Sequence, residues 1–311
     1  MTENETPVRI GVTGASGKVG SLVAELLASS PASSGAGSAS AASREVRLIV
    51  RTSSRAPRLV EAPGVSVTIH QATYADSEAC RTAFAGLDVL FLVSAGESLD
   101  RMTEHRSVID AARAAGVRHV VYTSFLGAAP DATFTLARDH YATEQLLRDS
   151  GMQWTFLRDS FYADVLLDFA GPERVLRGPA GDGRCAFVAR HDVAHVAAAV
   201  LEDPSAYEQR TLNLTGPEAL TMGEVAMRLT DALGRSYEFE DETLEEARQS
   251  RAGYGAEDWQ VEAWISTYTA IASGELSAVS GDVRAVLGRE PMSVGQTVRA
   301  IVAAEGPEQW V

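Results

Sequence analysis

Three glycines at positions 14, 17 and 20 have a spacing that could bind a phosphate group. They follow the β-branched run of residues 8–13 and precede residues 21–28, whose leucines and valines have helical spacing. In such a turn the first glycine permits the bend, the second lets the backbone approach a pyrophosphate, and the third lets the helix pack against the strand. Because the positive end of a helix dipole attracts anions, the pattern predicts a dinucleotide site formed by Thr13, Gly14, Ser16, Gly17, Lys18 and Val19.

The residue after the second predicted strand, 46–50, decides which dinucleotide such a site prefers. A carboxylate there hydrogen-bonds a ribose 2′-hydroxyl, whereas an arginine accepts a 2′-phosphate. Here the residue is Arg51, Arg55 follows nearby, and Lys18 lies in the glycine turn. These cations predict NADP as the cofactor, with NADPH preferred over NADH. Arg58 is also close in sequence, but we interpret it as part of a solvated face.

Small residues, most of them polar, end two further predicted strands. Ser94 and Ala95 follow the apolar run 87–93, and Thr123 and Ser124 follow the run 117–122. An open α/β sheet binds its ligand at the carboxyl ends of its strands. We therefore assign these four residues to the nicotinamide ribose. The alternative is that they only cap the two strands.

The elements that must hold these residues alternate along the first half of the chain. Strands are predicted at residues 8–13, 46–50, 65–70, 87–93, 117–122 and 154–157, and helices at 21–28, 77–85, 100–115 and 138–150. This alternation predicts βαβ units in a Rossmann-type, doubly wound parallel sheet of the α/β class. Residues 29–43 consist of Ser, Ala, Gly and Pro and are expected to form a flexible loop inserted between the first helix and the second strand.

Beyond residue 159 the alternation loosens. Helices are predicted at 192–201 and 222–233, a short strand at 211–214, and a mostly helical acidic segment at 244–273. We therefore expect residues 1–158 to form an NADP-binding Rossmann domain. Residues 159–311 are expected to form a smaller, mostly helical C-terminal substrate-capping region, partly interleaved with the sheet.

The 311 residues carry 42 acidic and 27 basic side chains, a net charge of −15. This balance disfavours nucleic acids and anionic membranes as partners, because clusters of basic residues bind both. No stretch approaches the roughly 20 apolar residues of a membrane span, and the first residues lack the order of a secretion signal. We therefore expect a cytoplasmic protein. Cys80 and Cys185 are far apart in sequence, which predicts two free thiols and no metal site.

Several motifs occur together in an order that resembles a known family. They are Thr-Gly-Ala-Ser-Gly-Lys-Val-Gly at 13–20, Ile-Val-Arg at 49–51, Ala-Phe-Ala-Gly at 83–86, Ala-Ala-Arg-Ala-Ala-Gly-Val-Arg-His at 111–119, Tyr-Thr-Ser at 122–124 and His-Tyr-Ala-Thr-Glu at 140–144. The sequence resembles the NmrA-like group of atypical short-chain dehydrogenase/reductases, in the branch of NAD(P)H:quinone oxidoreductases and triphenylmethane reductases. This resemblance covers roughly residues 8–300 and implies hydride transfer from NADPH to a quinone or another electron-poor conjugated aromatic, such as a biosynthetic intermediate, an azo compound or a cationic dye.

The ordinary enzymes of the wider superfamily use a Tyr-x-x-x-Lys pair, in which the lysine lowers the pKa of the tyrosine hydroxyl. Tyr141 is instead followed by Gln145 at the fourth position, and Lys18 is the only lysine of the chain. An alcohol dehydrogenase or a sugar-nucleotide epimerase is therefore not expected. What remains is hydride transfer to an acceptor whose product can take a proton from water.

His140 and Tyr141 are the candidate catalytic residues. The resemblance implies that His140 lies near the nicotinamide or the substrate, as a positioning group or a proton donor. Glu144, one helical turn further on, could orient its imidazole. The alternative for His140 is a buried structural histidine. Tyr141 could act as an acid without a lysine.

The candidate substrate residues are Phe125, Asp159, Phe161 and Tyr162. Residues 157–162 resemble the family's Leu-Arg-Asn-x-x-Tyr, with Asp159 in place of the asparagine. This carboxyl could favour a cationic or proton-accepting substrate, or it could be a surface change. The aromatic residues could line a cleft, although such residues are more often simply core.

Thr73 is the remaining candidate cofactor residue. It stands before Tyr74, where the family usually has an aspartate. A contact between a carboxylate and the adenine is therefore not expected at this position.

Two functions remain open. The first is an NADPH-dependent reductase of a small aromatic molecule. The second is an NmrA-like redox sensor that binds NADP without turnover and acts through a protein partner. In either case the chain could assemble as a homodimer.

Overall fold

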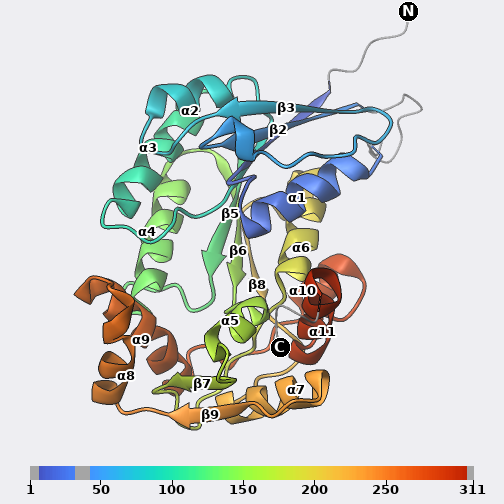
Figure 1. Cartoon of the computed structure of the whole chain (residues 1–311). Coiled ribbons are helices and arrows are strands. Elements are labelled where there is room, and N and C mark those ends of the chain that lie inside the picture. The colour runs from blue at the N-terminus through green and yellow to red at the C-terminus, as the bar shows by residue number, and fades with distance from the viewer. Residues whose placement is uncertain (1–6, 32–42, 307–311) are drawn as a thin grey trace, which may run out of the picture. The chain divides into compact units, whose positions relative to one another are not determined.

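A computed structural model gives the fold of the chain and describes residues 7–31 and 43–306 (Figure 1). The first strand and helix lie where the sequence predicts them, with β1 at Val8–Thr13 and α1 at Lys18–Ser29. The flexible loop expected at residues 29–43 falls mainly on residues 32–42, which lie outside the described residues. Ser29, the first residue of that expected loop, still belongs to α1.

Seven strands form the main sheet in the order β3-β2-β1-β4-β5-β6-β8. The pairs β1–β2, β2–β3, β1–β4 and β4–β5 are parallel. The chain moves outward from β1 to β3 and then returns to place β4 on the other side of β1, so the strand order reverses between β1 and β4. The predicted doubly wound parallel sheet is confirmed. Its strands after β1 are β2 (Arg44–Val50), β3 (Val65–Gln71), β4 (Val89–Leu92), β5 (His119–Phe125), β6 (Gln153–Asp159) and β8 (Arg210–Leu214).

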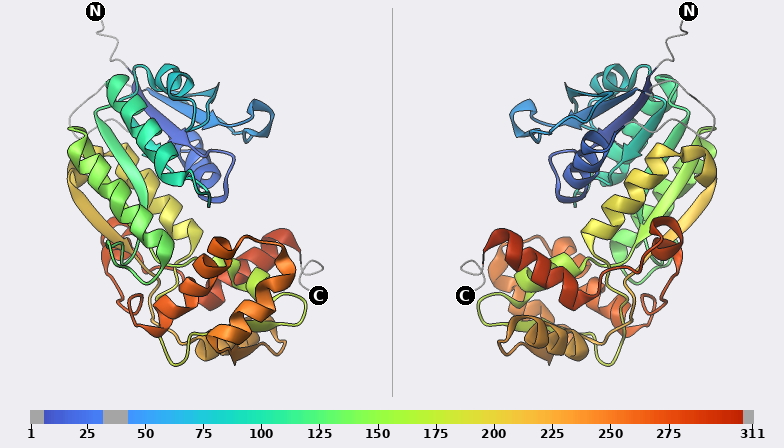
Figure 2. Two further views of the ribbon diagram at one scale, coloured as in Figure 1. Left: turned by 90° about the vertical axis from the view of Figure 1, so that its left-hand side faces the viewer. Right: turned by 90° about the vertical axis from the view of Figure 1, so that its right-hand side faces the viewer.

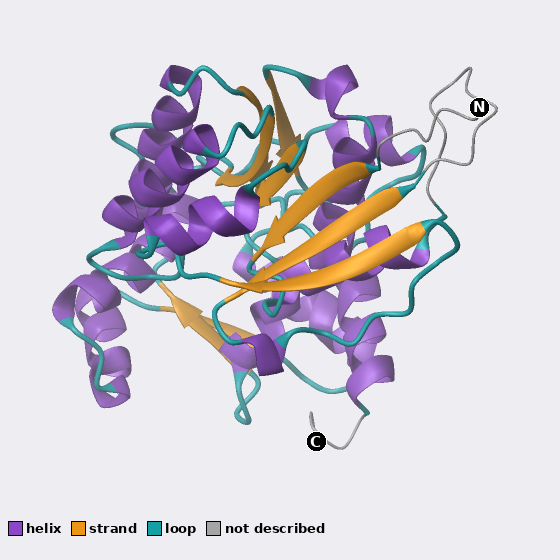
Figure 3. Ribbon diagram, turned by 90° about the horizontal axis from the view of Figure 1, so that it is seen from above, coloured by secondary structure: helices purple, strands orange, loops and turns teal. Residues whose placement is uncertain are grey.

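Helices cover both faces of this sheet. One group consists of α2 (Ser77–Phe84), α3 (Arg101–Ala114) and α4 (Thr135–Asp149), and the other of α1 and α6 (Arg190–Glu202). The two turned views in Figure 2 bring each group to the front in turn. Figure 3 shows the strands in orange among these helices. All four residues of β4 are buried, as expected for a parallel strand covered on both sides.

The chain forms two compact units, which it enters alternately. Unit 1 comprises residues 1–124, 142–157 and 193–212, and unit 2 comprises residues 125–141, 158–192 and 213–311. Each unit has its own apolar core, with Phe84, Leu90 and Phe156 in unit 1 and Leu229 and Ile271 in unit 2. The domain boundary expected after residue 158 lies one residue beyond the second stretch of unit 1.

Unit 2 is mostly helical and contains a second, two-stranded parallel sheet of β7 (Val175–Gly178) and β9 (Glu238–Asp241). The sequence pattern predicts neither of these strands, nor α5, α10 and α11. The α-helices that lie wholly in this unit are α5 (Leu166–Ala170), α7 (Met222–Leu233), α8 (Leu244–Arg251), α9 (Asp258–Ala272), α10 (Asp282–Leu287) and α11 (Val294–Glu305). Short 3-10 helices are η1 (Ser53–Arg55), η2 (Ala163–Val165), η3 (Pro204–Tyr207) and η4 (Ala252–Tyr254).

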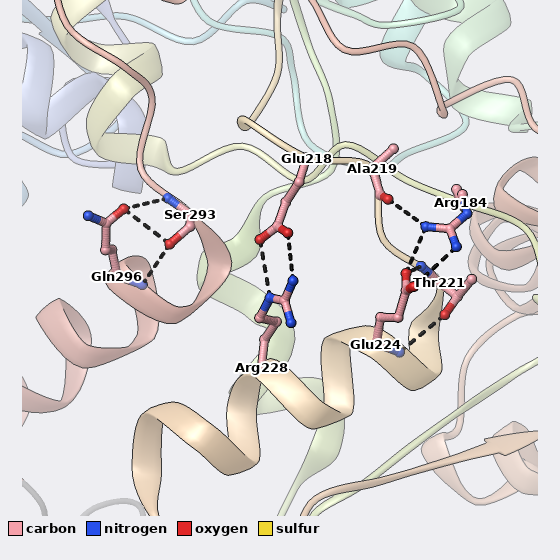
Figure 4. A network of polar contacts seen from close by, with 8 residues as sticks. All are labelled: Arg184, Glu218, Ala219, Thr221, Glu224, Arg228, Ser293 and Gln296. Carbon is pink, nitrogen blue, oxygen red and sulfur yellow. Dashed lines mark hydrogen bonds and ion pairs between the residues drawn. The ribbon is translucent and has the colours of Figure 1, made fainter.

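Side-chain caps fix where α7 and α11 of unit 2 begin (Figure 4). Thr221 accepts a hydrogen bond from the Glu224 N–H at the start of α7, and the Glu224 carboxylate accepts one from the Thr221 N–H. Ser293 and Gln296 form the same capping box at the start of α11. Arg184 also binds Glu224, at 2.8 Å, so the cap of α7 is joined to a loop 40 positions earlier in the sequence. A capping box satisfies backbone N–H groups that a helix leaves unpaired.

The length and composition of the helices show whether any of them could span a membrane. Among residues 7–31 and 43–306, none of the helices has both the length and the apolar composition needed to cross a bilayer.

Candidate functional site

The glycine turn between β1 and α1 is tightly closed. Gly14 has a φ of +59°, in the left-handed region that favours glycine, and its carbonyl accepts a hydrogen bond of 2.8 Å from the Gly17 N–H. A Cβ atom at Gly20 would lie 2.3 Å from the Gly14 carbonyl oxygen, so position 20 admits no side chain. The bend at Gly14 and the close approach of the helix at Gly20 are thus both present, as the spacing predicts.

The first turn of α1 is suited to bind an anion. Gly17 is the N-cap and has no side chain to cap the helix, and the first turn contains no acidic residue. The first N–H groups of a helix lack partners within the helix and carry the positive end of its dipole. Ser16, Gly17 and Lys18 are exposed, whereas Val19 is buried and anchors the helix to the core. This cradle therefore fits a pyrophosphate.

Three exposed basic side chains lie in this part of unit 1. They are Lys18 on α1, Arg51 directly after β2, and Arg55 in η1. Among the residues that the structure describes, none of the three has an acidic partner within 4.0 Å. They are therefore free to bind a phosphate group of a dinucleotide.

Thr13 joins β1 to β4 at the point where the strand order reverses. Its hydroxyl donates to the Phe91 carbonyl at 3.0 Å and accepts from the Val93 N–H at 2.9 Å. The Tyr74 hydroxyl lies 2.6 Å from both Thr13 Oγ1 and the Val93 carbonyl. The side chain of Thr13 is thus used within the protein, and a direct contact of Thr13 with the cofactor stays a prediction. Sequence reasoning missed the role of Tyr74, which comes from β3's connection to α2.

The next predicted residues lie at the carboxyl ends of β4 and β5. The Ser94 N–H donates to Thr123 Oγ1 at 2.8 Å, and the Ser124 hydroxyl donates to Glu144 Oε1 at 2.6 Å. The sequence predicts that this strand ends at residue 122, before Thr123 and Ser124. In the structure β5 extends to Phe125, so both residues lie within the strand. Thr123 and Ser124 therefore have structural partners, and their contact with a ribose stays a prediction.

Glu144 is fully buried and binds residues of unit 1. It accepts the bond from Ser124, and one of its oxygens lies 3.5 Å from Arg148. Arg148 also covers the ring of Trp154, with 4.4 Å between the guanidinium carbon and the ring centroid. The expected orientation of His140 by Glu144 stays a prediction.

Thr73 and Ala95 hold their neighbours through the backbone. The carbonyl of Thr73, whose side chain is exposed, accepts hydrogen bonds from the Cys80 thiol at 3.1 Å and from the Asp76 N–H at 3.0 Å. The Ala95 N–H donates to His105 Nε2 at 2.8 Å. His105 is a second residue that sequence reasoning missed, because only the fold brings α3 to the end of β4.

Aromatic rings pack together in unit 2. The ring centroid of Phe125 lies 4.8 Å from that of Phe134 and 4.9 Å from that of Phe161. The centroid of the His140 imidazole lies 6.1 Å from the centroid of the Phe125 ring, and the two ring planes are inclined by 33°. His140 is 7% exposed, so it is a buried histidine on an aromatic cluster, while Tyr141 is half-buried. The structure thus brings together three predicted residues, Phe125, Phe161 and His140, and adds Phe134.

Asp159 ends β6 and is only 3% exposed, so a surface change is the wrong interpretation of this residue. Its Oδ2 accepts a hydrogen bond from the Tyr162 hydroxyl, and its Oδ1 has no hydrogen-bond partner among the described residues. Burial raises the pKa of Asp159 to about 8, against the opposing effect of the Tyr162 hydrogen bond. The carboxyl group is therefore mainly uncharged at neutral pH, which weakens the expectation that it attracts a cation.

The predicted site residues divide between the two units. All thirteen candidate cofactor residues, from Thr13 to Ser124, belong to unit 1, whereas His140, Tyr141 and the candidate substrate residues belong to unit 2. The change falls between the consecutive residues Ser124 and Phe125 of β5. Cys80 and Cys185 are buried free thiols. In residues 7–31 and 43–306 no group of three or more His, Cys, Asp or Glu side chains is arranged to hold a metal ion.

The sheet, its reversal point and the glycine turn define a Rossmann-type dinucleotide-binding protein. A family model described as NAD(P)H-binding matches residues 14–204. The chain belongs to this family, in the NmrA-like branch of the atypical short-chain dehydrogenase/reductases, and it is an NAD(P)H-dependent oxidoreductase, as the motifs predict.

Three relatives define the branch more closely. Quinone oxidoreductase 2 of Escherichia coli is 35% identical over 236 residues, covering 75% of this chain and 77% of the relative. The structure of that NADPH-dependent quinone oxidoreductase in complex with NADPH matches this chain with a TM-score of 0.80 and 30% identity. The match covers 94% of this chain and 99% of the relative. The NAD(P)H azoreductase of Xenophilus azovorans is 31% identical over 302 residues, covering 95% of this chain and 98% of the relative. The triphenylmethane reductase of a Citrobacter species has a TM-score of 0.78, 30% identity and coverage of 95% and 99%.

Proposed function

We propose that this protein is an NADPH-dependent reductase that transfers hydride to a quinone or to another electron-poor conjugated aromatic. The observation that carries the proposal is the glycine cradle of unit 1, with its free cations Lys18, Arg51 and Arg55. A 2′-phosphate would add a charge that these side chains can bind, and an NADH molecule lacks that group. Relatives named for quinone, azo and triphenylmethane substrates support the class of acceptor.

The chemistry of the candidate site agrees with such an acceptor. When bound, NADPH supplies the hydride, and the protein supplies orientation and a site sheltered from water. Tyr141 has no lysine partner in the sequence, so an acceptor that needs a strong acid in the same step is disfavoured. A reduced quinone can take its proton from water. His140 then acts as a positioning group for the ring system and not as an obligatory acid.

Unit 2 holds a cluster of aromatic rings beside His140, with Phe125 and Phe134 buried in the apolar core and Phe161 packed against it. Phe125, Phe134 and Phe161 lie at mutual centroid distances of 4.8 to 5.2 Å, which are typical of aromatic pairs. The raised pKa of the buried Asp159 removes a negative charge that would otherwise favour a cationic acceptor. These features favour a neutral, carbonyl-bearing acceptor such as a quinone over a cationic dye.

Oxidation of NADPH by the purified full-length chain tests the proposal. The acceptors are a panel of quinones, an azo compound and a cationic triphenylmethane dye, and absorbance at the NADPH band is the readout. We expect turnover with quinones, faster than with the cationic dye. Tight NADPH binding without turnover on any acceptor would contradict the proposal and support a redox sensor. The same titrations with NADH test the cofactor preference separately.

A further inference from the structure

The loop that follows β4 is held by side chains from other elements. Residues 93–96 belong to no helix or strand, yet Val93 to Ala95 are not exposed. Thr123 Oγ1 accepts from the Ser94 N–H, as described above. The Ala95 carbonyl accepts from Arg101 Nε at 3.1 Å, and the Ala95 N–H donates to His105 Nε2 at 2.8 Å. Both polar backbone groups of Ala95 thus depend on side chains of α3.

The second nitrogen of His105 is also engaged. Its Nδ1 lies 2.7 Å from Thr143 Oγ1, in the part of α4 that belongs to unit 1. Because Nε2 accepts a hydrogen bond from the Ala95 N–H, the ring must be neutral with its hydrogen on Nδ1, which donates to Thr143. The imidazole has no exposed surface, and burial, with a smaller effect of Arg101, lowers the pKa of His105 to about 3. The neutral ring therefore stays an acceptor toward the Ala95 N–H at neutral pH.

We propose that His105 is a positioning residue for the cofactor, which fixes the backbone of the 93–96 loop at the reversal point of the sheet. The proposal rests on the proposed function in one respect, namely that this loop contacts NADPH. Ligands of open α/β sheets bind outside the carboxyl ends of the strands at this point. Small displacements of a positioning group slow a reaction strongly, because the reacting atoms must lie within a narrow range of distances.

Two isosteric substitutions separate the two hydrogen bonds of the ring. In His105→Gln the amide can reach the place of Nε2 and still accept from the Ala95 N–H. In His105→Asn the shorter amide reaches the place of Nδ1, so the bond to Thr143 is kept and the bond to Ala95 is lost. Both substitutions remove a buried ring, so their losses of stability should be similar.

His119 provides the matched control. It is 4% exposed, burial lowers its pKa to about 4, and its Nε2 lies 2.8 Å from Thr155 Oγ1. It is the first residue of β5, at the opposite end of that strand from Ser124. His119→Asn should therefore cost stability without changing the 93–96 loop.

The first readout needs no cofactor. Amide hydrogen exchange at Ala95, followed by NMR or in a peptide that covers residues 93–96, should be about tenfold faster or more in His105→Asn than in His105→Gln, as expected for the loss of one hydrogen bond. The second readout is single-turnover NADPH oxidation with a quinone. We expect a loss of roughly tenfold to a hundredfold in His105→Asn, partial rescue in His105→Gln, and the wild-type rate in His119→Asn.

Each outcome bears on one proposal or the other. Equal exchange at Ala95 in the two His105 variants would overturn the positioning role, whatever the wild-type chain reduces. Faster exchange in His105→Asn with unchanged NADPH affinity and hydride transfer would show that the loop does not serve the cofactor, and would also overturn it. A wild-type chain that reduces no acceptor would contradict the proposed function, while the exchange data would still decide whether His105 holds the loop.

Discussion

At the scale of single residues, the two arginines within β2 bind other parts of the protein, whereas the arginine that follows β2 is exposed. Arg44 is 5% exposed, donates to the Leu27 carbonyl at 2.7 Å and pairs with Glu202 at 3.0 Å. Arg47 donates to the Ala83 carbonyl at 2.8 Å and pairs with Glu45. Both side chains stabilise the fold. Arg51 is exposed and, within the described part of the chain, has no acidic partner, so it is available to a ligand.

Replacing Arg51 with alanine should therefore affect the cofactor and not the fold. A charge-assisted hydrogen bond to the 2′-phosphate contributes roughly 1.5 to 3 kcal/mol, so the Kd for NADPH should rise about tenfold or more. NADH lacks the phosphate and should be nearly unaffected. Fluorescence titration with both cofactors measures this, with Arg58→Ala as the control for a nearby exposed arginine. An equal loss for NADPH and NADH would contradict the assignment.

Asp159 should make stability depend on pH. Its pKa is raised from 3.8 to about 8 in the folded protein, so between these values the folded chain holds a proton that the unfolded chain has lost. The stability from this group is complete below pH 3.8 and falls as the pH rises through the window up to about 8, at a rate of at most about 1.4 kcal/mol per pH unit.

Asp159→Asn should remove this dependence and make the protein more stable near pH 8 than the wild type. Urea unfolding at several pH values between 5 and 8 measures the slope. Asp168→Asn, at an exposed carboxylate of α5, serves as the control and should leave the slope unchanged. The assignment fails if the Asp159 variant retains the wild-type slope.

The sequence predicts the local features that depend on near neighbours, such as the bend at Gly14, the close helix packing at Gly20 and the position of Arg51 directly after β2. It did not find Tyr74 or His105, since their partners Thr13 and Ala95 lie 61 and 10 positions away. The sequence also could not predict the protonation state of Asp159, because the burial of its carboxyl group at the end of β6 depends on how unit 2 packs.

At the scale of elements, the turn between β1 and α1 assigns different tasks to its glycines. At Gly17 an added Cβ would lie 3.1 Å from the Gly14 oxygen, and the residue is exposed with a φ of −91° that any residue adopts. At Gly20 the corresponding distance is 2.3 Å, to backbone that cannot move aside. Gly20 thus serves the packing of the helix, whereas the role of Gly17 toward the ligand stays a prediction.

Two variants should show this difference. Gly17→Val should abolish NADPH binding with little change in thermal stability, because the side chain occupies the place of the pyrophosphate. Gly20→Ala should lower the free energy of unfolding by about 1 to 3 kcal/mol or more, through overpacking. Gly223→Ala in α7, whose added Cβ would meet only Thr221 Oγ1 at 3.9 Å, is the control. Retained NADPH affinity in folded Gly17→Val would place the phosphates elsewhere.

The elements that the sequence predicts correctly have regularly spaced apolar residues and are bounded by glycines or other turn residues. The strands of the main sheet and α1 to α4 agree with the prediction to within a few residues. The small strands β7 and β9, Val-Leu-Arg-Gly and Glu-Phe-Glu-Asp, are four residues long and partly charged. Such segments show no period of their own, and only their pairing makes them strands.

At the scale of the whole molecule, net charge and local charge have different consequences. The chain has a net charge of −15, yet its candidate cofactor is an anion. Charges in solution are screened over about 8 Å at physiological salt, so the near cations Lys18, Arg51 and Arg55 decide binding more than distant carboxylates do. The acidic balance is therefore compatible with an anionic cofactor.

The candidate cofactor residues and the aromatic cluster belong to different compact units, which predicts separate responses to the two ligands. All candidate cofactor residues lie in unit 1, and the aromatic cluster with His140 lies in unit 2. NADPH at a hundred times its Kd should stabilise the protein by about 2.7 kcal/mol. Hydrogen exchange should show protection by NADPH alone at residues 13–20, 51–55 and 93–96.

Protection around Phe125, Phe134 and Phe161 should appear only when a non-reducible quinone analogue is added together with NADP. Arg51→Ala, examined at subsaturating NADPH, is the control, and it should weaken the protection in unit 1. Equal protection of both regions by NADPH alone would show that the residues of unit 2 take part in cofactor binding. The aromatic cluster would then belong to the nicotinamide and not to the acceptor, and the search for the substrate site would have to move to other residues of unit 2.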